Sequence, residues 1–371
     1  MGQCFESLRE NKEDRISLQS QNKVSIQEKV YDNYRNNFTT QMSVVQVEEL
    51  TQKIDISHFK LLKTLGKGAC GKVLLVKKRN NNTQYAMKIV SKEKVKEEYI
   101  RTERFILEHI KHPFITKLHY AFQSNSKLYL VMDFCQGGEL FFHLRRAYKF
   151  SEEQSKFYIC EIIVALEYLH KNNILYRDLK PENILICQDG HIKLIDFGLS
   201  KILTTIKTRS HSVVGTPEYL APEIYQDDGQ GHDEQCDWWS LGALLYEMLT
   251  GTAPFYNVDR TLMFRNRLEK PLDLKPWLSE ECKSLLQGLL NNDASQRLDV
   301  NQIKSHQFFK DIDWIGVAYK SLEPPIKIEF NGPLDLSNFN RMFVDEPATD
   351  SPISFKEGKK IENFSFDEDQ P

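Results

Sequence analysis

Apolar and polar positions divide the chain into three stretches. Residues 1 to about 57 are rich in Gln, Asn, Glu and Lys and contain only short apolar clusters. Ile26, Val30 and Tyr34 recur at helical spacing, which predicts at most a partial helix. Because this stretch has little apolar surface to bury, we expect residues 1–57 to form a partly disordered, mobile extension.

Short apolar runs predict strands from residue 59 onward. Leu61 and Leu62 lead into a glycine-rich segment, VLLV and QYAMKIV follow with NNNT between them, and LYLVMDF resembles a further buried strand. A charged stretch from about Lys92 to Ile110 predicts a helix. The first part of residues 59–314 is therefore expected to be rich in β-structure.

The second part of residues 59–314 has helical periodicity. Ser151 and Gln154 make a capping box before FYICEIIVALEYLH, and CDWWSLGALLYEMLTG is apolar nearly all round, which predicts a helix inside the core. After about Trp314 the chain is rich in Pro, Asp, Asn and Ser with isolated phenylalanines. We expect residues 315–371 to be an irregular tail that lies over the surface.

Composition narrows the class of protein. The 371 residues carry a net charge of −3, with 27% charged residues, so nothing calls for nucleic acid as a partner. No apolar run approaches the ~20 residues of a membrane span, and no signal peptide is seen. Seven scattered cysteines fit a reducing compartment. We therefore expect an intracellular, cytoplasmic enzyme or binding protein.

A glycine-rich segment, LGKGACGKV, suggests a phosphate site. Gly66, Gly68 and Gly71 have the spacing G-x-G-x-x-G, which serves dinucleotide-binding enzymes and protein kinases alike. In the dinucleotide fold the segment opens a helix, whereas here it runs into VLLV, and Lys88 follows at the end of YAMK. A strand lysine after such a loop favours the kinase arrangement. A plain hairpin remains an alternative for the loop alone.

A downstream stretch concentrates the remaining chemistry. YRDLKPENILICQDGHIKLIDFG supplies Asp178, Lys180, Asn183 and Asp196. Between them ILI and IKLI look like short buried strands, which would hold these polar groups at fixed separations. The alternative, solvated charges on loops, does not account for that interleaving.

With these motifs the chain resembles a eukaryotic protein kinase over about residues 59–314. GTPEYLAPE, DWWSLG and QRL agree with the resemblance. It implies an α+β, two-lobed protein kinase fold, with a small β-rich N-lobe, a larger helical C-lobe, and ATP with Mg²⁺ in the cleft between them. The tail segments PPIKIEF, NFNRMF, DEPATDSPISF and IENFSFDED are similar to the C-terminal tail of AGC kinases, particularly serum- and glucocorticoid-regulated kinase and protein kinase B.

The resemblance implies a role for each polar residue. Asp178 would accept or orient the proton of the substrate hydroxyl, and Lys180 would steady the transferred phosphoryl group. Asn183 and Asp196 would bind magnesium. Lys180 two residues after Asp178 is similar to serine/threonine rather than tyrosine kinases.

The resemblance also implies a nucleotide site beneath LYLVMDFCQGGEL. Met132 would limit access to a back pocket, and the backbone from Asp133 to Cys135 would bond the adenine edge. The implied ATP-binding residues are Leu65, Gly66, Lys67, Gly68, Ala69, Cys70, Gly71, Lys72, Val73, Ala86, Lys88, Glu103, Met132, Asp133, Cys135, Glu139 and Leu185. A stacked apolar column that joins the lobes, or plain core, would contain Leu107, Leu118, Tyr176 and Phe197.

Three serines occupy positions that are phosphorylated in the AGC group. Ser212 lies before VVGTPEY in the activation loop, where a phosphate would pair with Arg177 and Lys201. Ser351 precedes a proline at the turn-motif position. Ser365 lies between two phenylalanines of a hydrophobic motif that would dock on the small lobe. An unmodified, disordered tail is the alternative for the last two.

Several positions depart from the family pattern. Cys70 replaces an aromatic residue at the loop tip, and is either an incidental small residue or a redox thiol whose thiolate Lys67 and Lys72 favour. Glu139 and Glu182 would attract arginine upstream of the phosphorylated residue. Arg265 stands where relatives place an acid, so we expect a basophilic kinase that tolerates a missing second arginine.

The N-terminus, MGQCFES, resembles an acylation site. Gly2 would carry myristate and Cys4 palmitate, but Glu6 stands where Ser or Thr is expected, so the modification stays open. One myristoyl chain binds membrane only marginally, so peripheral membrane association would need Cys4 as well.

The sequence thus predicts an active serine/threonine kinase that acts on proteins with basic residues upstream of the phosphorylated residue and is itself phosphorylated by an upstream kinase. A catalytically silent kinase-fold scaffold and, more distantly, a nicotinamide-binding enzyme are the alternatives. The sequence names neither the physiological substrate nor the pathway.

Overall fold

The computed structural model describes residues 53–68, 71–203, 209–226, 231–350 and 359–369. Residues 54–371 belong to one compact unit, and Met1–Lys53 belong to another. The expectations for the N-terminal extension, for Gly2 and Cys4, for Ala69 and Cys70, and for Ser351 lie outside the described residues. Among the described helices, none is both long and apolar enough to cross a bilayer.

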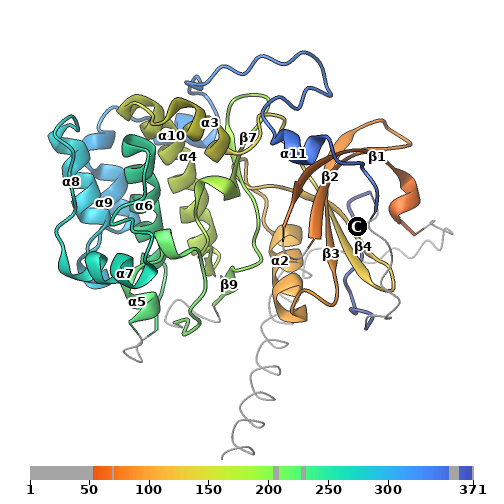
Figure 1. Ribbon diagram of the computed structural model, residues 1–371, viewed down its shortest axis with the longest axis horizontal. Coiled ribbons are helices and arrows are strands. Elements are labelled where there is room, and N and C mark those ends of the chain that lie inside the picture. Colours follow the sequence, from red (N-terminus) through yellow and green to blue (C-terminus); the bar gives the residue numbers. More distant parts are fainter. Residues whose placement is uncertain (1–52, 69–70, 204–208, 227–230, 351–358, 370–371) are drawn as a thin grey trace, which may run out of the picture. The chain divides into compact units, whose positions relative to one another are not determined.

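An antiparallel sheet and one helix make up the smaller lobe (Figure 1). The sheet has the order β1-β2-β3-β5-β4-β10. Its first five strands in sequence are β1 (Phe59–Lys67), β2 (Gly71–Lys78), β3 (Gln84–Ser91), β4 (Leu118–Gln123) and β5 (Lys127–Met132). The helix is α2 (Glu97–His109). The strands expected from VLLV and QYAMKIV are therefore confirmed, and the one expected from LYLVMDF is confirmed up to Met132, where β5 ends.

Both faces of the sheet are covered, which explains the apolar run in β5. Leu128, Leu130 and Met132 belong to the main hydrophobic core, whereas Tyr129 and Val131 belong to a second cluster on the other face. Since side chains alternate between faces, a central strand buried on both sides reads as a continuous apolar run. β5, which leads into the inter-lobe segment, is thus held between β3 and β4.

The predicted start of the first helix is wrong. The charged pattern indicated a helix from about Lys92, but α2 begins at Glu97, and residues 92–94 form a turn in which Lys94 N donates to Ser91 O. Lys92 Nζ instead contacts Gln123 Oε1 of β4 at 2.9 Å. A tertiary contact thus holds these residues outside the helix.

The larger lobe is helical, as predicted. Ser151 caps α4 (Glu152–Lys171) in a capping box with Gln154. Fourteen of the sixteen residues of α6 (Gln235–Thr250) are buried, which confirms the core helix expected from CDWWSLG. The other helices are α3 (Leu140–Ala147), α5 (Pro222–Tyr225), α7 (Arg260–Glu269), α8 (Glu280–Leu289), α9 (Val300–Ser305) and α10 (Trp314–Ala318).

Four short strands sit between α4 and α6 in the sequence. β6 (Ile174–Leu175) pairs with β9 (Lys201–Ile202), and β7 (Ile184–Ile186) pairs with β8 (Ile192–Leu194). The apolar segments ILI and IKL are thus the predicted buried strands. They fix the positions of the polar segments on either side of them. Single turns of 3-10 helix occur at Ile56–His58, Pro181–Asn183, Pro217–Tyr219, Ala294–Gln296 and Gln307–Phe309.

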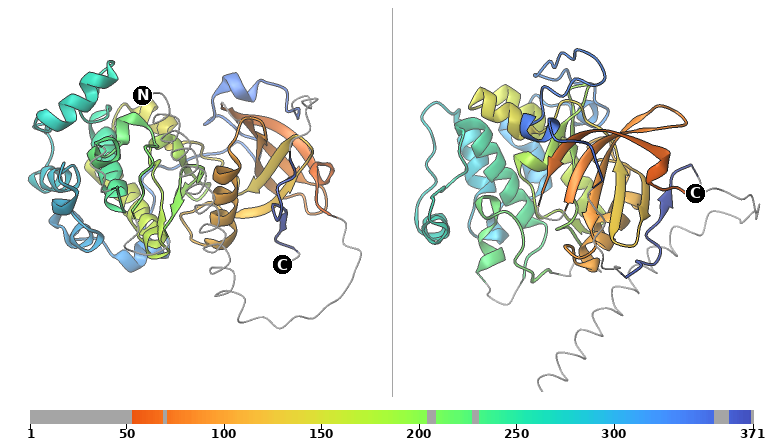
Figure 2. Two further views of the ribbon diagram at one scale, coloured as in Figure 1. Left: turned by 90° about the horizontal axis from the view of Figure 1, so that it is seen from below. Right: turned by 45° about the vertical axis from the view of Figure 1, so that its right-hand side comes forward.

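The tail is more regular than its sequence indicated. It contains α11 (Arg341–Val344), which packs against β1, and β10 (Phe366–Asp367), which pairs with β4 as the sixth strand of the sheet. α11 lies over the first strands in both Figure 1 and the right-hand view of Figure 2. Asn340 caps α11 by accepting from Met342 N at 3.0 Å. The expected irregular tail is therefore wrong for these two elements.

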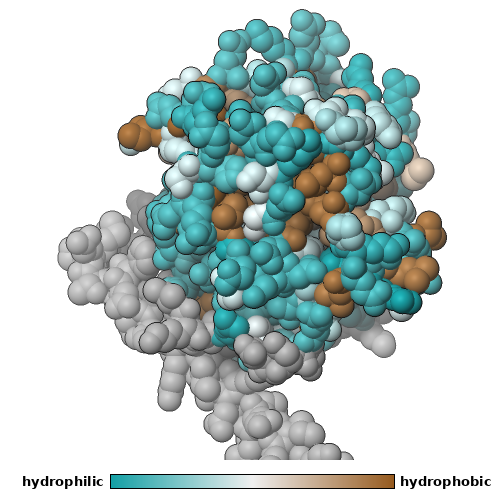
Figure 3. All heavy atoms as spheres, turned by 90° about the vertical axis from the view of Figure 1, so that its left-hand side faces the viewer, coloured by the Kyte–Doolittle hydropathy of each residue, from teal (hydrophilic) through white to brown (hydrophobic). Residues whose placement is uncertain are grey.

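The end of the helical lobe that carries α8 presents a mainly hydrophilic surface with scattered hydrophobic patches (Figure 3). Exposed apolar side chains of this lobe include Tyr256, Val258, Leu262 and Trp277. Single exposed apolar residues are common on protein surfaces.

Candidate active site

Three charged side chains from different elements meet between the lobes. Lys88 Nζ of β3 lies 2.6 Å from Glu103 Oε1 of α2 and 3.0 Å from Asp196 Oδ1, which follows β8. Glu103 is only 3% exposed, so its carboxylate is held in the protein interior beside one amine. A buried carboxylate without that partner would be strongly destabilising.

The charges of this cluster shift each other's proton affinities. Burial lowers the pKa of Lys88, but attraction to Glu103 and Asp196 outweighs it, and the net pKa lies above the usual value. Attraction to Lys88 keeps the pKa of Asp196 below its usual value despite burial. Lys88 is therefore a cation and Asp196 an anion at neutral pH.

Local backbone geometry aims Asp196 at Lys88. β8 ends at Leu194, Ile195 N donates to Asn183 O at 3.0 Å, and Asp196 then adopts φ 58°. Few residues other than glycine, mainly Asn and Asp, adopt this left-handed conformation. Gly198 N donates to Asp196 Oδ1 at 3.2 Å, which closes the turn.

A second polar cluster forms around Asp178. Asn183 Nδ2 donates to Asp178 Oδ2 at 2.8 Å, and Lys180 Nζ lies 2.9 Å from the same oxygen. Thr216 Oγ1 donates to Asp178 Oδ1 at 2.8 Å and accepts from Lys180 Nζ at 2.9 Å. The structure thus brings Asp178, Lys180 and Asn183 together, as the motif spacing indicated.

Thr216 was not predicted as a site residue. It lies within GTPEYLAPE, which was recognised only as a motif, yet its hydroxyl links Asp178 to Lys180. It is 38 residues from Asp178, so no local pattern connects the two.

A fully buried aspartate holds the segment before Asp178. Asp237 accepts from Tyr176 N at 2.9 Å, from Arg177 N at 2.7 Å, and from His170 Nε2 at 2.8 Å. Arg177 has φ 66°, so this segment is bent into an unusual conformation that these bonds maintain. Asp237 thus joins His170 of α4 to the backbone that leads into Asp178.

The glycine segment is described on both sides of its tip. A Cβ at Gly66 or Gly68 would meet no atom within 4 Å, whereas a Cβ at Gly71 would come within 1.8 Å of Ile89 O. Glycine is thus required at Gly71 by the close approach of β3. Lys67 Nζ lies 3.5 Å from Glu346, and Lys72 Nζ donates to Thr349 O, so both lysines contact the tail.

Two side chains of the inter-lobe segment that follows β5 contact neighbouring elements. Ala86 pairs with Met132, and Glu139 forms a bridge with Leu185. Asp133 contacts His119 at 2.8 Å and also Lys193, while Cys135 contacts Cys187. Burial raises the pKa of Asp133, but hydrogen bonds from His119 and Lys193 outweigh it and keep the pKa well below its usual value.

Some backbone groups of this segment form hydrogen bonds within the protein. Asp133 N donates to Lys117 O at 3.2 Å, and Cys135 O accepts from Gly138 N at 3.3 Å. These bonds do not involve the Asp133 carbonyl or the Cys135 amide.

Apolar residues continue the connection between the lobes. Leu107, Leu118, Tyr176 and Phe197 all belong to the main core and are nearly inaccessible. The rings of Tyr176 and Phe197 are 5.3 Å apart in an edge arrangement. The four residues are packed in the core; a separate role for them stays a prediction.

Ser212 lies beside a buried arginine. Arg177 Nη1 donates to Ser212 Oγ at 2.6 Å and to Ser210 Oγ at 2.9 Å, while Arg177 Nε donates to Leu199 O. Lys201, the second predicted partner, lies 3.9 Å from Glu98 of α2. The described structure therefore brings Ser212 to Arg177.

The hydrophobic motif packs against the small lobe. Phe364 is 1% exposed and lies in the main core, whereas Ser365 is exposed. Arg104 of α2 donates to Phe364 O at 3.0 Å and to Ser365 O at 3.3 Å. Asp350, next to Ser351, contacts Lys127 Nζ at 2.6 Å and the Tyr129 hydroxyl at 2.9 Å.

Two glutamates make an acidic site at the start of α3. Glu182 Oε2 is buried without a hydrogen-bond partner among the described residues. Loss of hydrating water around the Glu139 carboxyl, followed by repulsion from Glu182, raises the pKa of Glu139. A cationic group placed between them would relieve this repulsion.

Comparison with known proteins agrees with this geometry. Residues 59–309 match the family model described as "Protein kinase domain". The chain is 47% identical over 304 residues to "Serine/threonine-protein kinase Sgk1" of Danio rerio, covering 80% of this chain and 70% of that protein, and 46% identical over the same shares to the Homo sapiens protein of that name. It is 42% identical over 327 residues to "RAC family serine/threonine-protein kinase homolog" of Dictyostelium discoideum, covering 85% of this chain and 73% of that protein.

Proposed function

We infer that this chain, which belongs to the protein kinase family, uses Lys88, Asp178 and Asp196 to transfer the γ-phosphate of ATP to protein hydroxyls. It is an ATP-dependent serine/threonine protein kinase of the AGC group. The observation that supports the residue assignment is the double contact of Lys88 with Glu103 and Asp196. This contact joins both lobes at one cation.

The residues fit a nucleotide with magnesium, which protein kinases generally use. Magnesium is usually bound through one or two protein oxygens together with substrate phosphates. Asp196 offers a carboxylate, and Asn183, whose amide nitrogen is bound to Asp178, has its amide oxygen for this task. We assign the metal to these two residues; it would neutralise phosphate charge when bound.

The proposed ATP site is built around Lys88. Lys88 would contact the α- and β-phosphates while Glu103 holds its amine in place. The Asp133 carbonyl and the Cys135 amide would bond the adenine edge. The other residues of the proposed site are Leu65, Gly66, Lys67, Gly68, Ala69, Cys70, Gly71, Lys72, Val73, Ala86, Met132, Glu139 and Leu185.

Asp178 is assigned to the substrate hydroxyl. Its two oxygens accept from Asn183 and Thr216, which fixes the carboxylate plane before a substrate arrives. Such pre-organisation is the main contribution a protein can make to phosphoryl transfer. Lys180, 2.9 Å from Asp178, would steady the phosphoryl group.

Regulation is proposed at three serines. Phosphorylation of Ser212 would turn its hydrogen bond to Arg177 into a charge-assisted pair. Ser365 is exposed between docked residues, and Ser351 follows Asp350, which contacts Lys127. An upstream kinase would phosphorylate Ser212.

The substrates we propose carry an arginine upstream of the phosphorylated residue. The repulsion between Glu139 and Glu182 supports a cation-binding site. Arg265, at the position where relatives carry an acid, contacts Glu269 at 2.9 Å, which favours substrates with a single arginine. Acylation at Gly2 and Cys4, with peripheral membrane contact, is a further proposal that intact-mass measurement would test.

We propose the domain limits 1–57 for an N-terminal extension, 59–314 for the kinase domain and 315–371 for the tail. Contacts of Glu346, Thr349 and Asp350 with the small lobe support treating the tail as part of the working kinase.

Phosphoryl transfer to peptides tests the assignment. With radiolabelled ATP and peptides carrying one or two upstream arginines, Asp178→Asn should lower kcat at least about 100-fold, because a correctly placed carboxylate is lost. Asp311→Asn, at an exposed aspartate far along the chain, is the matched control. Equal rates for Asp178→Asn and the unchanged protein would favour a scaffold, and a strict need for two arginines would oppose the proposed specificity.

A further inference from the structure

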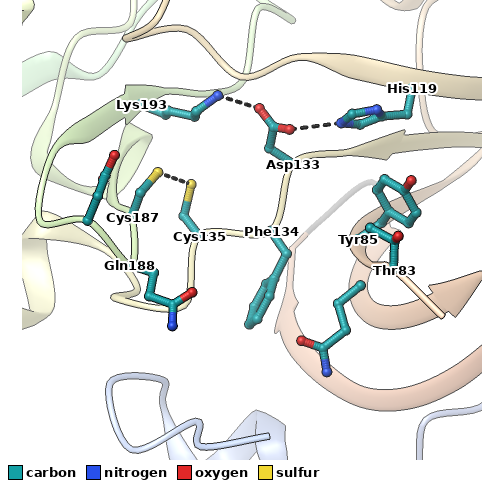
Figure 4. A pocket seen from close by; sticks show the side chains of 11 residues that line it. Thr83, Tyr85, His119, Asp133, Phe134, Cys135, Cys187, Gln188 and Lys193 are labelled. Carbon is teal, nitrogen blue, oxygen red and sulfur yellow. Dashed lines mark hydrogen bonds and ion pairs between the residues drawn. The ribbon is translucent and has the colours of Figure 1, made fainter. Parts of the chain in front are cut away.

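A pair of thiols lies where the segment that joins the lobes meets the end of β7. Cys135 Sγ and Cys187 Sγ are 2.6 Å apart, and both cysteines are free. Figure 4 shows the two side chains pointing toward each other, one from the inter-lobe segment and one from the end of β7. We propose that Cys135 and Cys187 form a reversible disulfide that ties the inter-lobe segment to the β7–β8 hairpin.

The backbone already holds the two cysteines in register. Ile186 N donates to Gly138 O at 2.8 Å, and Glu139 bridges to Leu185. Cys187 N donates to His191 O at 2.8 Å, which fixes the turn that follows. Bringing the sulfurs to the bonded distance of about 2.05 Å therefore requires only a small side-chain shift.

The two thiols border a cavity, and they differ in how far they are exposed. A cavity of about 580 Å³ is lined by both cysteines together with His119, Asp133 and Lys193. Cys187 is half-buried, whereas Cys135 is 2% exposed. A small oxidant would therefore reach Cys187 first.

The surroundings divide the roles of the two thiols. The hydrogen bond with Cys187, followed by burial, raises the pKa of Cys135 well above its usual value. The Lys193 ammonium is close enough to both sulfurs to be affected by their charge. Because Cys187 is also the more exposed of the two, we assign the first reaction to Cys187 and the closing of the bond to Cys135.

The chemistry balances with hydrogen peroxide as the oxidant. The Cys187 thiolate attacks one peroxide oxygen, the O–O bond breaks, and a sulfenic acid and one water form after proton uptake. Cys135 then attacks Cys187 Sγ, its thiol proton leaves with the hydroxyl as a second water, and the S–S bond forms. Two thiols are oxidised and one peroxide is reduced.

The other cysteines in the described part of the chain are poor competitors. Cys160, Cys236 and Cys282 are each buried in the helical lobe. Burial raises the pKa of all three, to about 12 for Cys282. Within the described residues, the 135–187 pair is the one with two sulfurs in contact.

Peptide mapping of the full-length protein tests the proposal. After hydrogen peroxide treatment and alkylation, we expect Cys135 and Cys187 to escape alkylation together, in one linked peptide lighter by two hydrogen atoms. Dithiothreitol should restore both. The melting temperature of the oxidised protein should rise by about 5 °C, because the bond closes a long loop.

Matched variants separate the pair from the other cysteines. Cys187→Ser should abolish both the linked peptide and the rise in melting temperature, and Cys135→Ser should do the same. Cys282→Ser should leave both unchanged. Stable sulfinic acid at Cys187, or linkage of either cysteine to a different partner, would overturn the proposal. These readouts do not depend on kinase activity, so they are independent of the proposed function.

Discussion

His232 makes folding stability depend on pH. It is 3% exposed and its backbone pairs with Ser210 in the activation segment. Burial, followed by the charge of Arg177, lowers its pKa from 6.5 to about 4, against the opposing carboxylates of Glu223, Asp233 and Asp237. The folded protein therefore keeps His232 neutral over a range in which the unfolded chain binds a proton.

The sign of the effect follows from this depressed pKa. Below about pH 6.5 the unfolded chain takes up a proton that the folded protein does not. The free energy of unfolding therefore decreases as the pH is lowered from about 6.5 to about 4. From pH 7 to pH 5 the loss due to His232 should be about 2 kcal/mol. Urea unfolding of His232→Gln should show a pH dependence that is weaker by that amount.

An exposed neighbour provides the control. His211→Gln, on the same segment, should leave the pH dependence as it is in the unchanged protein. If His232→Gln and the unchanged protein lost the same stability between pH 7 and pH 5, His232 would not be the responsible group.

The last strand, β10, is too short to be stable by backbone pairing alone. It comprises two residues, and isolated short strands are only marginally stable. Charges beyond it supply further contacts: Glu368 lies 2.5 Å from Lys117 Nζ and also contacts His119, and Asp369 lies 2.5 Å from Lys78 Nζ. His119 in turn contacts Asp133, so the chain end is linked to the inter-lobe segment.

Removing these charges should loosen β10. Each pair is partly exposed and contributes about 1 kcal/mol or less, so the double change Glu368→Gln, Asp369→Asn should raise the opening of β10 several-fold. Hydrogen exchange of the β4 amides should report it as faster exchange. Asp345→Asn, at an exposed tail carboxylate, is the control. Unchanged exchange in β4 would show that contacts other than these two carboxylates hold β10 in place.

The elements with strong local patterns could be predicted from the sequence. The apolar runs VLLV and QYAMKIV, the Ser151–Gln154 capping box and the apolar run of α6 all depend on neighbours in sequence, and each matches the structure. Asp178, Lys180 and Asn183 could also be found because the first and the last are only five positions apart. These signals are local.

The rest depends on contacts between distant residues. β10 consists of two residues whose conformation is set by β4, more than 240 positions earlier, as the separation of 249 between His119 and Glu368 shows. Thr216 reaches Asp178 across 38 residues, and Cys135 meets Cys187 across 52. No periodicity in the sequence encodes such pairings. The contact of Lys92 with Gln123 is likewise between distant residues, and α2 begins after it, at Glu97.

Across the whole kinase unit, the tail and Lys88 are connected through α2. Arg104 of α2 binds the backbone of Phe364 and Ser365, and Glu103, the preceding residue, holds Lys88. Lys88 then contacts Asp196 of the larger lobe. We therefore expect a change in how the tail docks to alter the position of Glu103. This coupling needs contacts from the tail, from α2 and from the larger lobe.

Phe364→Ala tests this connection. Loss of a buried phenylalanine should cost about 3–5 kcal/mol and free the Arg104 end of the tail. If α2 then moves, the Lys88–Glu103 contact is lost in part of the population, and kcat/KM for a basic peptide should fall about 10-fold even well below the melting temperature. Met342→Ala, at a tail side chain that is 72% exposed, should change neither quantity. A Phe364→Ala protein that melts earlier but keeps full kcat/KM would mean that α2 is held in place without the tail.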